Sequence, residues 1–273
     1  MPKRPLRSLS PPPQASAIYD SWLGEIEERL SDPGTDRYSL CRQTLYEIFY
    51  PGFGDYSEII SDPSTPLATK SALLALDPNN ITLEPEYYAE VETEKFARVK
   101  PLIWLWQSFD RSPLGGTNVD VGIRLRRILA KHIFKRCGKN FKSFQFVEFS
   151  FGYNLEIGDN VVVHRHVLLD DRGGITLGNN VSLADYANVY SHTHDLADQS
   201  DVTNHVTVLE DGVRITYHAT VLSGVRVGTN AMVGAGAVAT KDVPPYHINL
   251  GIPAKPVRLK PNAPENIKLN EKS

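Results

Sequence analysis

The chain has 273 residues, of which 41% are hydrophobic and 22% charged, and this composition predicts a globular protein with a substantial core. Its formal net charge of −3 disfavours nucleic acid as a partner recognised through bulk charge. The two cysteines, Cys41 and Cys137, form no CxxC pair, which fits a reducing compartment and excludes a cysteine-based zinc site.

The first thirteen residues are basic and rich in proline, and they lack the continuous apolar core of a secretory signal. No apolar run approaches the length of a membrane span. We therefore expect a cytoplasmic protein with no membrane span.

Residues 1–138 have a helical but irregular pattern, and their role is not indicated by the sequence. Ile18, Trp22, Ile26 and Leu30 recur at steps of four, which predicts an amphipathic helix over residues 16–30. Further helices are expected over residues 40–49, 66–76 and 85–99, because proline, glycine and aspartate separate these stretches.

The segment 121–136 is the strongest helix candidate. Asn118 and Asp120 are suited to cap its start, and Gly138 follows its end. Its apolar stripe consists of Val121, Leu125, Ile128, Leu129 and Ile133. Arginines and lysines, Arg126 among them, occupy the remaining positions. Such a face suits a membrane surface or an anionic ligand, but a solvated face or one packed against acidic residues is the commoner case and is our prediction.

From Ile157 onward the sequence repeats every six residues. Large aliphatic residues recur at this spacing, and a small or β-branched residue follows each of them after four positions, as Val161 follows Ile157. Neither a helix nor an alternating strand has this period, whereas the hexapeptide repeat of a parallel β-helix does. We predict about four coils, over residues 157–176, 177–194, 209–226 and 227–244. The β-helix domain is expected over residues 139–260, with an inserted loop at 195–208 and a tail at 261–273.

Two stretches carry a family resemblance, "ITLGNNVSLADYANVYSHTHDL" and "VGTNAMVGAGAVATKDVPPYHINLGIPAK". With the loop between them, they resemble the hexapeptide-repeat acyltransferases, particularly the maltose and galactoside O-acetyltransferase type and its polysaccharide-modifying relatives. The resemblance implies a left-handed β-helix, a homotrimer with active sites between subunits, and direct transfer of an acyl group from acetyl-CoA or another CoA thioester. The acceptor is then a hydroxyl of a sugar or similar small molecule, and no metal is expected. The first hundred residues resemble no family that we can name.

His194 is the candidate general base. The resemblance places a histidine at this point of "SHTHDL", and in the repeat register its side chain points outward, five positions after Val189. A hydroxyl is a weak nucleophile, so a base must remove its proton as it attacks the thioester carbonyl. His192 is the second candidate in the catalytic site, and it either orients His194, contacts the acceptor or faces solvent.

The remaining site candidates come from the resemblance. It assigns Ala235, Thr240 and Lys241 to the pantetheine arm and phosphates of CoA, and Arg258 to the nucleotide end, where a cation suits phosphate. It aligns His166 with a polar substrate position of the sugar acetyltransferases, and Asp170 and Asp171 with a stretch in which relatives also carry acidic residues; a plain surface position is the alternative for each of them.

Two residues depart from the family pattern. Arg214 stands where relatives have tryptophan, and Tyr217 stands where they have a small residue beside donor and acceptor. Arginine favours carboxylate or phosphate over the face of a neutral sugar, which predicts an anionic acceptor. The alternative is that Arg214 pairs with Glu210 or Asp211.

Two other functions remain open from the sequence. The histidines of the first two predicted coils suit a γ-type carbonic anhydrase, which binds zinc on a β-helix. The departures at Arg214 and Tyr217 also fit a trimeric scaffold without catalytic activity.

Overall fold

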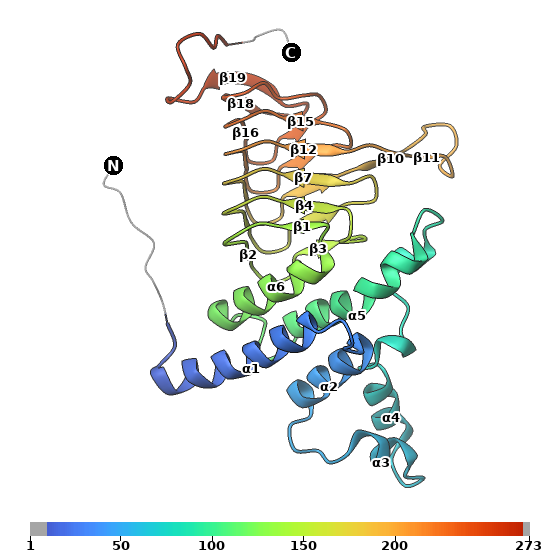
Figure 1. Ribbon diagram of the computed structural model, residues 1–273. Coiled ribbons are helices and arrows are strands. Elements are labelled where there is room, and N and C mark those ends of the chain that lie inside the picture. Colours follow the sequence, from blue (N-terminus) through green and yellow to red (C-terminus); the bar gives the residue numbers. More distant parts are fainter. Residues whose placement is uncertain (1–9, 270–273) are drawn as a thin grey trace.

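The computed structural model describes residues 10–269, so most of the proline-rich start and the end of the predicted tail lie outside the described residues. An α-helical part forms one end of the molecule, and a parallel β-helix rises from it (Figure 1). Helix α6 packs against the first coil of the β-helix, whereas β18 and β19 close the opposite end (Figure 1).

The N-terminal part contains six α-helices and two short 3₁₀ helices among the described residues. They are α1 (Pro13–Ser31), α2 (Arg37–Phe49), α3 (Tyr56–Ser61), α4 (Leu67–Leu74), η1 (Pro78–Asn80), η2 (Glu84–Tyr87), α5 (Thr93–Asp110) and α6 (Val119–Ile133). The single helix predicted over residues 85–99 was wrong. Pro85 lies in the short turn η2, Glu92 is extended, and α5 then runs from Thr93 through Pro101 to Asp110. Burial of Leu102, Trp106 and Phe109 explains why the second half of α5 is helical despite the proline.

Helix α6 confirms the predicted division between an apolar stripe and a basic face. The five residues of the stripe are buried. On the other face, Arg124 pairs with Asp20 and Lys131 with Glu27 at 2.6 Å, and just beyond the end of the helix Lys135 pairs with Glu156 at 2.7 Å. Arg126 differs, because its guanidinium is only 2% exposed and pairs with the buried carboxylate of Asp110 at the junction with α5.

The β-helix consists of three parallel sheets, each of which takes one strand from every coil. The first sheet contains β1 (Arg136–Cys137), β4 (Leu155–Ile157), β7 (Ile175–Leu177), β12 (Thr207–Leu209) and β15 (Arg226–Val227). The second contains β2 (Lys142–Ser143), β5 (Val162–Val163), β8 (Ser182–Leu183), β13 (Arg214–Ile215), β16 (Met232–Val233), β18 (His247–Leu250) and β19 (Lys255–Leu259), the last antiparallel. The third contains β3 (Glu148–Phe149), β6 (Leu168–Asp170), β9 (Asn188–Tyr190), β14 (Thr220–Val221) and β17 (Val238–Ala239).

The hexapeptide phase fixes the register of the coils. Ile157 lies opposite Leu177, Leu177 opposite Leu209 and Leu209 opposite Val227, so one aliphatic column fills the interior behind the first sheet. An additional coil formed by β1, β2 and β3 precedes the four predicted ones. The repeat did not predict this coil, because Phe141 stands where the pattern has a small residue and Ser143 where it has a large aliphatic one. Helices α5 and α6 cover the open end of this coil. There the rings of Trp106 and Phe149 pack edge to face, with their centroids 5.3 Å apart.

The three corners of the coil differ in their regularity. The first corner is turned by asparagines in the left-handed region, with φ between 55° and 59°: Asn140, Asn160, Asn180 and Asn230. The second corner carries a column of stacked rings. The third corner is irregular, because two extra residues precede β7 and a hairpin follows β9. This third corner holds the site.

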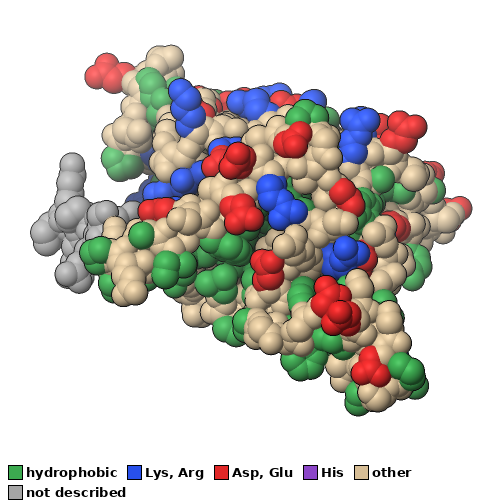
Figure 2. All heavy atoms as spheres, turned by 60° about the horizontal axis from the view of Figure 1, so that its bottom comes forward, with side chains coloured by type: hydrophobic (Ala, Val, Ile, Leu, Met, Phe, Trp, Pro, Cys, Tyr) green, Lys and Arg blue, Asp and Glu red, His purple; other side chains and the backbone are tan. Residues whose placement is uncertain are grey.

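Figure 2 shows the helical end of the molecule, where basic and acidic side chains are interspersed among apolar ones. No helix within residues 10–269 has the length and hydropathy that a membrane crossing requires.

Candidate active site

The hairpin of β10 (His192–His194) and β11 (Val202–Asn204) projects from the third corner of the β-helix (Figure 1). The two strands are antiparallel, with His192 opposite Asn204 and His194 opposite Val202. Most of the predicted inserted loop, residues 195–208, therefore forms the tip and second strand of an ordered hairpin. Both candidate histidines lie on its first strand.

The imidazole of His194 is exposed and is held by the hairpin tip. Its Nδ1 lies 2.7 Å from the backbone oxygen of Gln199. A carbonyl oxygen only accepts, so this contact requires the proton on Nδ1. The Nε2 atom of the neutral ring is then free to accept a proton from a ligand.

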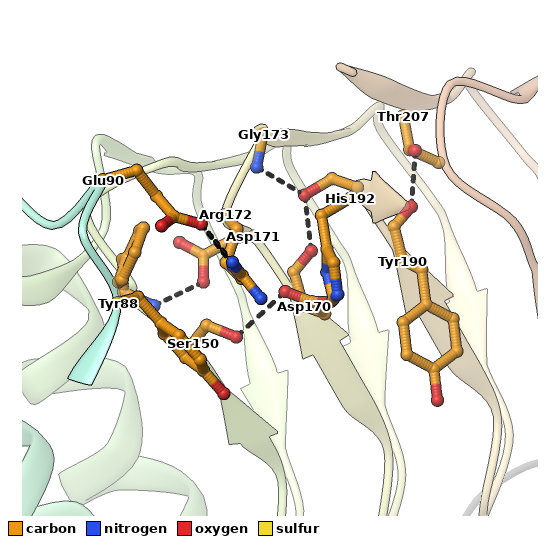
Figure 3. Close-up of polar contacts among 12 residues, drawn as sticks. Tyr88, Glu90, Ser150, Asp170, Asp171, Arg172, Gly173, Tyr190, His192 and Thr207 are labelled. Carbon is orange, nitrogen blue, oxygen red and sulfur yellow. Dashed lines mark hydrogen bonds and ion pairs between the residues drawn. The ribbon is translucent and has the colours of Figure 1, made fainter. Parts of the chain in front are cut away.

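The imidazole of His192 lies deeper and faces a buried carboxylate. Its Nδ1 contacts Oδ2 of Asp170, and the two side chains are 16% and 6% exposed (Figure 3). The other oxygen of Asp170 accepts a hydrogen bond from the hydroxyl of Ser150 at 3.0 Å. Ser191 donates at 2.5 Å to the backbone oxygen of Asp170, which fixes the strand beside His192. Asp170 and its two serines therefore hold one ring orientation of His192.

A segment of the N-terminal part, residues 83–92, forms the facing wall of the site. Arg172 donates from Nε to Glu90 at 2.6 Å, and its guanidinium lies 4.0 Å from the ring centre of Tyr88 (Figure 3). The amide of Glu92 donates to the hydroxyl of Tyr153 at 3.0 Å. These contacts bind residues 83–92 to the third corner of the β-helix.

The titratable groups of this wall are held in fixed charge states. The hydrogen bond that Tyr88 donates to Glu84, together with burial, raises the pKa of the Tyr88 phenol to about 12. Burial raises the pKa of the Glu90 carboxyl, but its own backbone amide and Arg172 outweigh burial and leave that pKa below its usual value. The Glu90–Arg172 pair is therefore charged at neutral pH.

Two cavities meet at this wall. One, of about 440 Å³, lies between α5, the third sheet and His192. The other, of about 790 Å³, lies between residues 87–90 and the β10–β11 hairpin, and His194 lines it. Tyr88, Arg172 and His192 line both cavities, so the two histidines and the N-terminal wall belong to one site. The size suits a small polar ligand.

The prediction for Asp171 needs a correction, because this side chain does not face the site. Asp171 is 0% exposed, and its carboxylate accepts hydrogen bonds from the amides of Phe151 at 2.7 Å and Asn154 at 3.2 Å. Burial raises the pKa of Asp171 to about 6. Asp171 thus shapes the corner, and its neighbour Asp170 is the carboxylate that lines the first cavity.

His166 and Arg214 lie away from the two histidines within the chain. His166 is stacked between Phe146 and Tyr186 in the ring column of the second corner, with centroids 5.0 and 4.8 Å apart. Arg214 projects from β13 of the second sheet. The alternative that Arg214 pairs with Glu210 or Asp211 is wrong among the described residues, since Glu210 pairs with Arg226 at 2.8 Å and the Asp211 carboxylate accepts from the amide of Asn179 at 2.7 Å.

The candidate donor-binding residues occupy exposed positions on the last two coils and beyond. Tyr217 and Ala235 lie at the second corner, before β14 and β17 respectively. Thr240 and Lys241 follow β17 at the third corner, two coils beyond the hairpin. Arg258 lies in β19, opposite Ile248. Within residues 10–269, neither Lys241 nor Arg258 has an ion-pair partner, so both cations are available to a ligand.

Tyr88, Glu90 and Arg172 were not predicted as site residues. The two extra residues that interrupt the repeat before Leu177 were a usable signal for Arg172, because they let the chain leave the coil at this corner. Nothing in the pattern of residues 83–92 indicates that they meet a corner of the β-helix. Among the described residues, no group of three His, Cys, Asp or Glu is arranged to hold a metal ion.

A parallel β-helix with an outward histidine on a hairpin that leaves the coil defines the class of hexapeptide-repeat acyltransferases. No protein-family model matches the chain. The chain is 30% identical over 140 residues to the galactoside O-acetyltransferase of Escherichia coli (strain K12). The aligned region covers 50% of this chain and 69% of that protein.

Two solved structures extend the comparison. A maltose O-acetyltransferase from Clostridium difficile 630 superposes with a TM-score of 0.54 and 25% identity, over 63% of this chain and 90% of that one. A galactoside acetyltransferase in complex with coenzyme A superposes with a TM-score of 0.55 and 25% identity, over 63% and 84%. The chain belongs to the galactoside O-acetyltransferase family of hexapeptide-repeat enzymes, and it is an acetyltransferase.

Proposed function

We propose that the protein transfers an acetyl group from acetyl-CoA to a hydroxyl of a sugar or a similar small acceptor, with His194 as the general base. The observation that carries this proposal is the geometry of His194. Its Nδ1 is occupied by the carbonyl of Gln199, and its ring lines a cavity beside the N-terminal wall. The relatives favour this activity over the carbonic anhydrase and scaffold alternatives.

The reaction follows from these contacts. The acceptor oxygen attacks the thioester carbonyl while Nε2 of His194 takes up the hydroxyl proton. A carbon–oxygen bond forms, the carbon–sulfur bond breaks, and the proton on His194 passes to the departing thiolate. The Gln199 carbonyl stabilises the protonated ring, because it accepts from Nδ1 throughout the step.

The donor is proposed to lie along the last two coils. Ala235 leaves room for an extended pantetheine arm, and the unpaired cations Lys241 and Arg258 suit its phosphates. Thr240 lies beside Lys241 at the third corner, and Tyr217 lies at the second corner, as Ala235 does. We also propose a cytoplasmic homotrimer in which a neighbouring subunit completes the site. Such a neighbour is required for His166 or Arg214 to meet the acceptor, so the preference for an anionic acceptor stays a prediction.

The test is release of free thiol from acetyl-CoA in the presence of a panel of sugars. We expect His194→Ala to lower transfer about a hundredfold or more, the usual effect of losing a general base, while the fold is retained. His192→Ala should lower it less. The matched control is Thr193→Ala, because Thr193 lies between the two histidines and lines neither cavity. Equal activity of His194→Ala and the wild type would remove His194 from the mechanism.

A further inference from the structure

The site contains two histidines whose Nδ1 atoms each face an oxygen acceptor, although acyl transfer to a hydroxyl requires only one base. The Nδ1 of His194 faces a backbone carbonyl, and the Nδ1 of His192 faces the Asp170 carboxylate. An oxygen acceptor beside Nδ1 favours the tautomer with its proton on Nδ1, and that tautomer presents Nε2 as the acceptor of the ring.

The two rings belong to one site. Their centroids are 5.2 Å apart, their planes are nearly perpendicular, and both line the larger cavity. They come from alternate residues of β10, and the hairpin pairing with β11 fixes their spacing. A ligand in this cavity therefore meets two proton acceptors at neighbouring positions.

The donor groups of the facing wall are already bonded to other protein groups. Arg172, which lines both cavities, is already paired with Glu90 and stacked on Tyr88 (Figure 3). Arg111 of the first cavity donates to the backbone oxygen of Gln107. The phenol of Tyr88 donates to Glu84. Among the described residues no group donates to Nε2 of His192, so a hydroxyl of a ligand in the cavity can donate to it.

Building on the proposed function, we propose that His192 and Asp170 form a binding site for a second hydroxyl of the acceptor, adjacent to the one that His194 deprotonates. The substrate class is therefore a compound with neighbouring hydroxyl groups, as in the ring of a pyranose. In this arrangement Asp170 holds the ring, His192 accepts a hydrogen bond from the bystander hydroxyl, and His194 alone takes up a proton.

The decisive variant is His192→Asn. The asparagine amide can take the place of Nδ1 and still donate to Asp170, but it has no group at the position of Nε2. His192→Gln, whose amide reaches toward the Nε2 position, is the second variant in case His192→Asn does not fold. Thr193→Ala is the control. Circular dichroism and light scattering establish the fold and assembly of each variant.

The acceptors are the methyl β-glycosides of galactose, glucose and galacturonic acid, each with its monodeoxy derivatives. For the parent that is acetylated, one derivative should be inert because it lacks the acetylated oxygen. A second derivative, lacking the neighbouring hydroxyl, should show kcat/KM lowered about tenfold in the wild type and in Thr193→Ala, the effect of one lost hydrogen bond. In His192→Asn this second loss should fall below about twofold.

Three results would overturn the inference. In the first, the wild type shows no loss of kcat/KM with any deoxy derivative other than the inert one. In the second, His192→Asn loses as much kcat/KM as the wild type when the neighbouring hydroxyl is removed. In the third, none of the three parent glycosides is acetylated. Calorimetry with acetyl-CoA separates these results from failure of the proposed function. Wild type that binds acetyl-CoA leaves the proposed function standing in each case, whereas absence of binding overturns the proposed function and this inference with it.

Discussion

At the scale of single residues, the third corner separates structural acidic residues from functional ones. Asp170 and Asp171 are adjacent, yet one faces the cavity and the other is enclosed by backbone amides. The alternation of side chains along an extended segment explains the difference, because neighbouring residues point to opposite sides. Each residue leads to a different prediction.

Asp171 makes stability depend on pH. Burial raises its pKa from 3.8 in the unfolded chain to about 6 in the folded one. A raised pKa means that its stabilising contribution is complete below about pH 4 and is lost as the pH rises through 6, by about 3 kcal/mol. We expect the stability advantage of wild type over Asp171→Asn to shrink by up to that amount between pH 4 and pH 7. Urea unfolding at fixed protein concentration measures it, and a difference independent of pH would contradict the assignment.

Lys241 is predicted to act on the donor alone. Its ammonium has no carboxylate partner within the described chain, and it lies two coils away from the hairpin. Lys241→Ala should raise KM for acetyl-CoA about tenfold, the scale of one charge-assisted hydrogen bond, and leave KM for the acceptor nearly unchanged. Initial rates with each substrate varied provide the measurement. An unchanged KM for acetyl-CoA would show that the lysine serves another purpose.

At the scale of elements, the junction between the two parts depends on one buried ion pair. Arg126 of α6 donates to Asp110 of α5 and to the backbone oxygen of Ser143 in β2, and the amide of Phe146 donates to Asp110 at 2.7 Å. Burial raises the pKa of Asp110 even though Arg126 opposes the change. The pair therefore fixes the helices to the first coil, and its two partners depend on each other.

Removal of one partner should be costly. Arg126→Met leaves a buried carboxylate without its cation, and we expect a loss of about 3–5 kcal/mol in the free energy of unfolding. Lys131→Met on the same helix breaks the exposed pair with Glu27 and should cost less than about 1 kcal/mol. Denaturant titration of both variants distinguishes the cases. Similar small losses would mean that the buried pair is dispensable.

At the scale of the whole molecule, the β-helix leaves apolar side chains on its outer surface. Leu222 is 39% exposed and Tyr217 58% exposed, at the two corners that flank β14. A neighbouring subunit that covers these corners would remove them from water.

We predict that the protein in solution has three times the 30.4 kDa mass of the chain. Leu222→Asp should dissociate the assembly, because it places charge in an apolar contact. Leu67→Asp, at an 80% exposed position of α4 in the helical part, should leave the mass unchanged. Light scattering at micromolar concentration measures the mass, and a monomeric wild type would contradict the prediction.

The sequence by itself determined the β-helix and the position of the hairpin histidines. A strict period of six with aliphatic columns such as Ile157, Leu177 and Leu209 admits one architecture, because each coil repeats the same local environment. Where the period breaks, before Leu177 and after Val189, the chain leaves the coil, and this marks the site.

Only the tertiary structure decided how the N-terminal part takes part in the site. Helix α5 passes through Pro101, and residues 83–92 reach Arg172 more than eighty positions away, because both depend on burial against the β-helix. The pairing of His192 with Asp170 likewise joins neighbouring coils through the stacking of the third sheet. Local patterns determine a repeat, whereas contacts between distant segments depend on packing that no local pattern records.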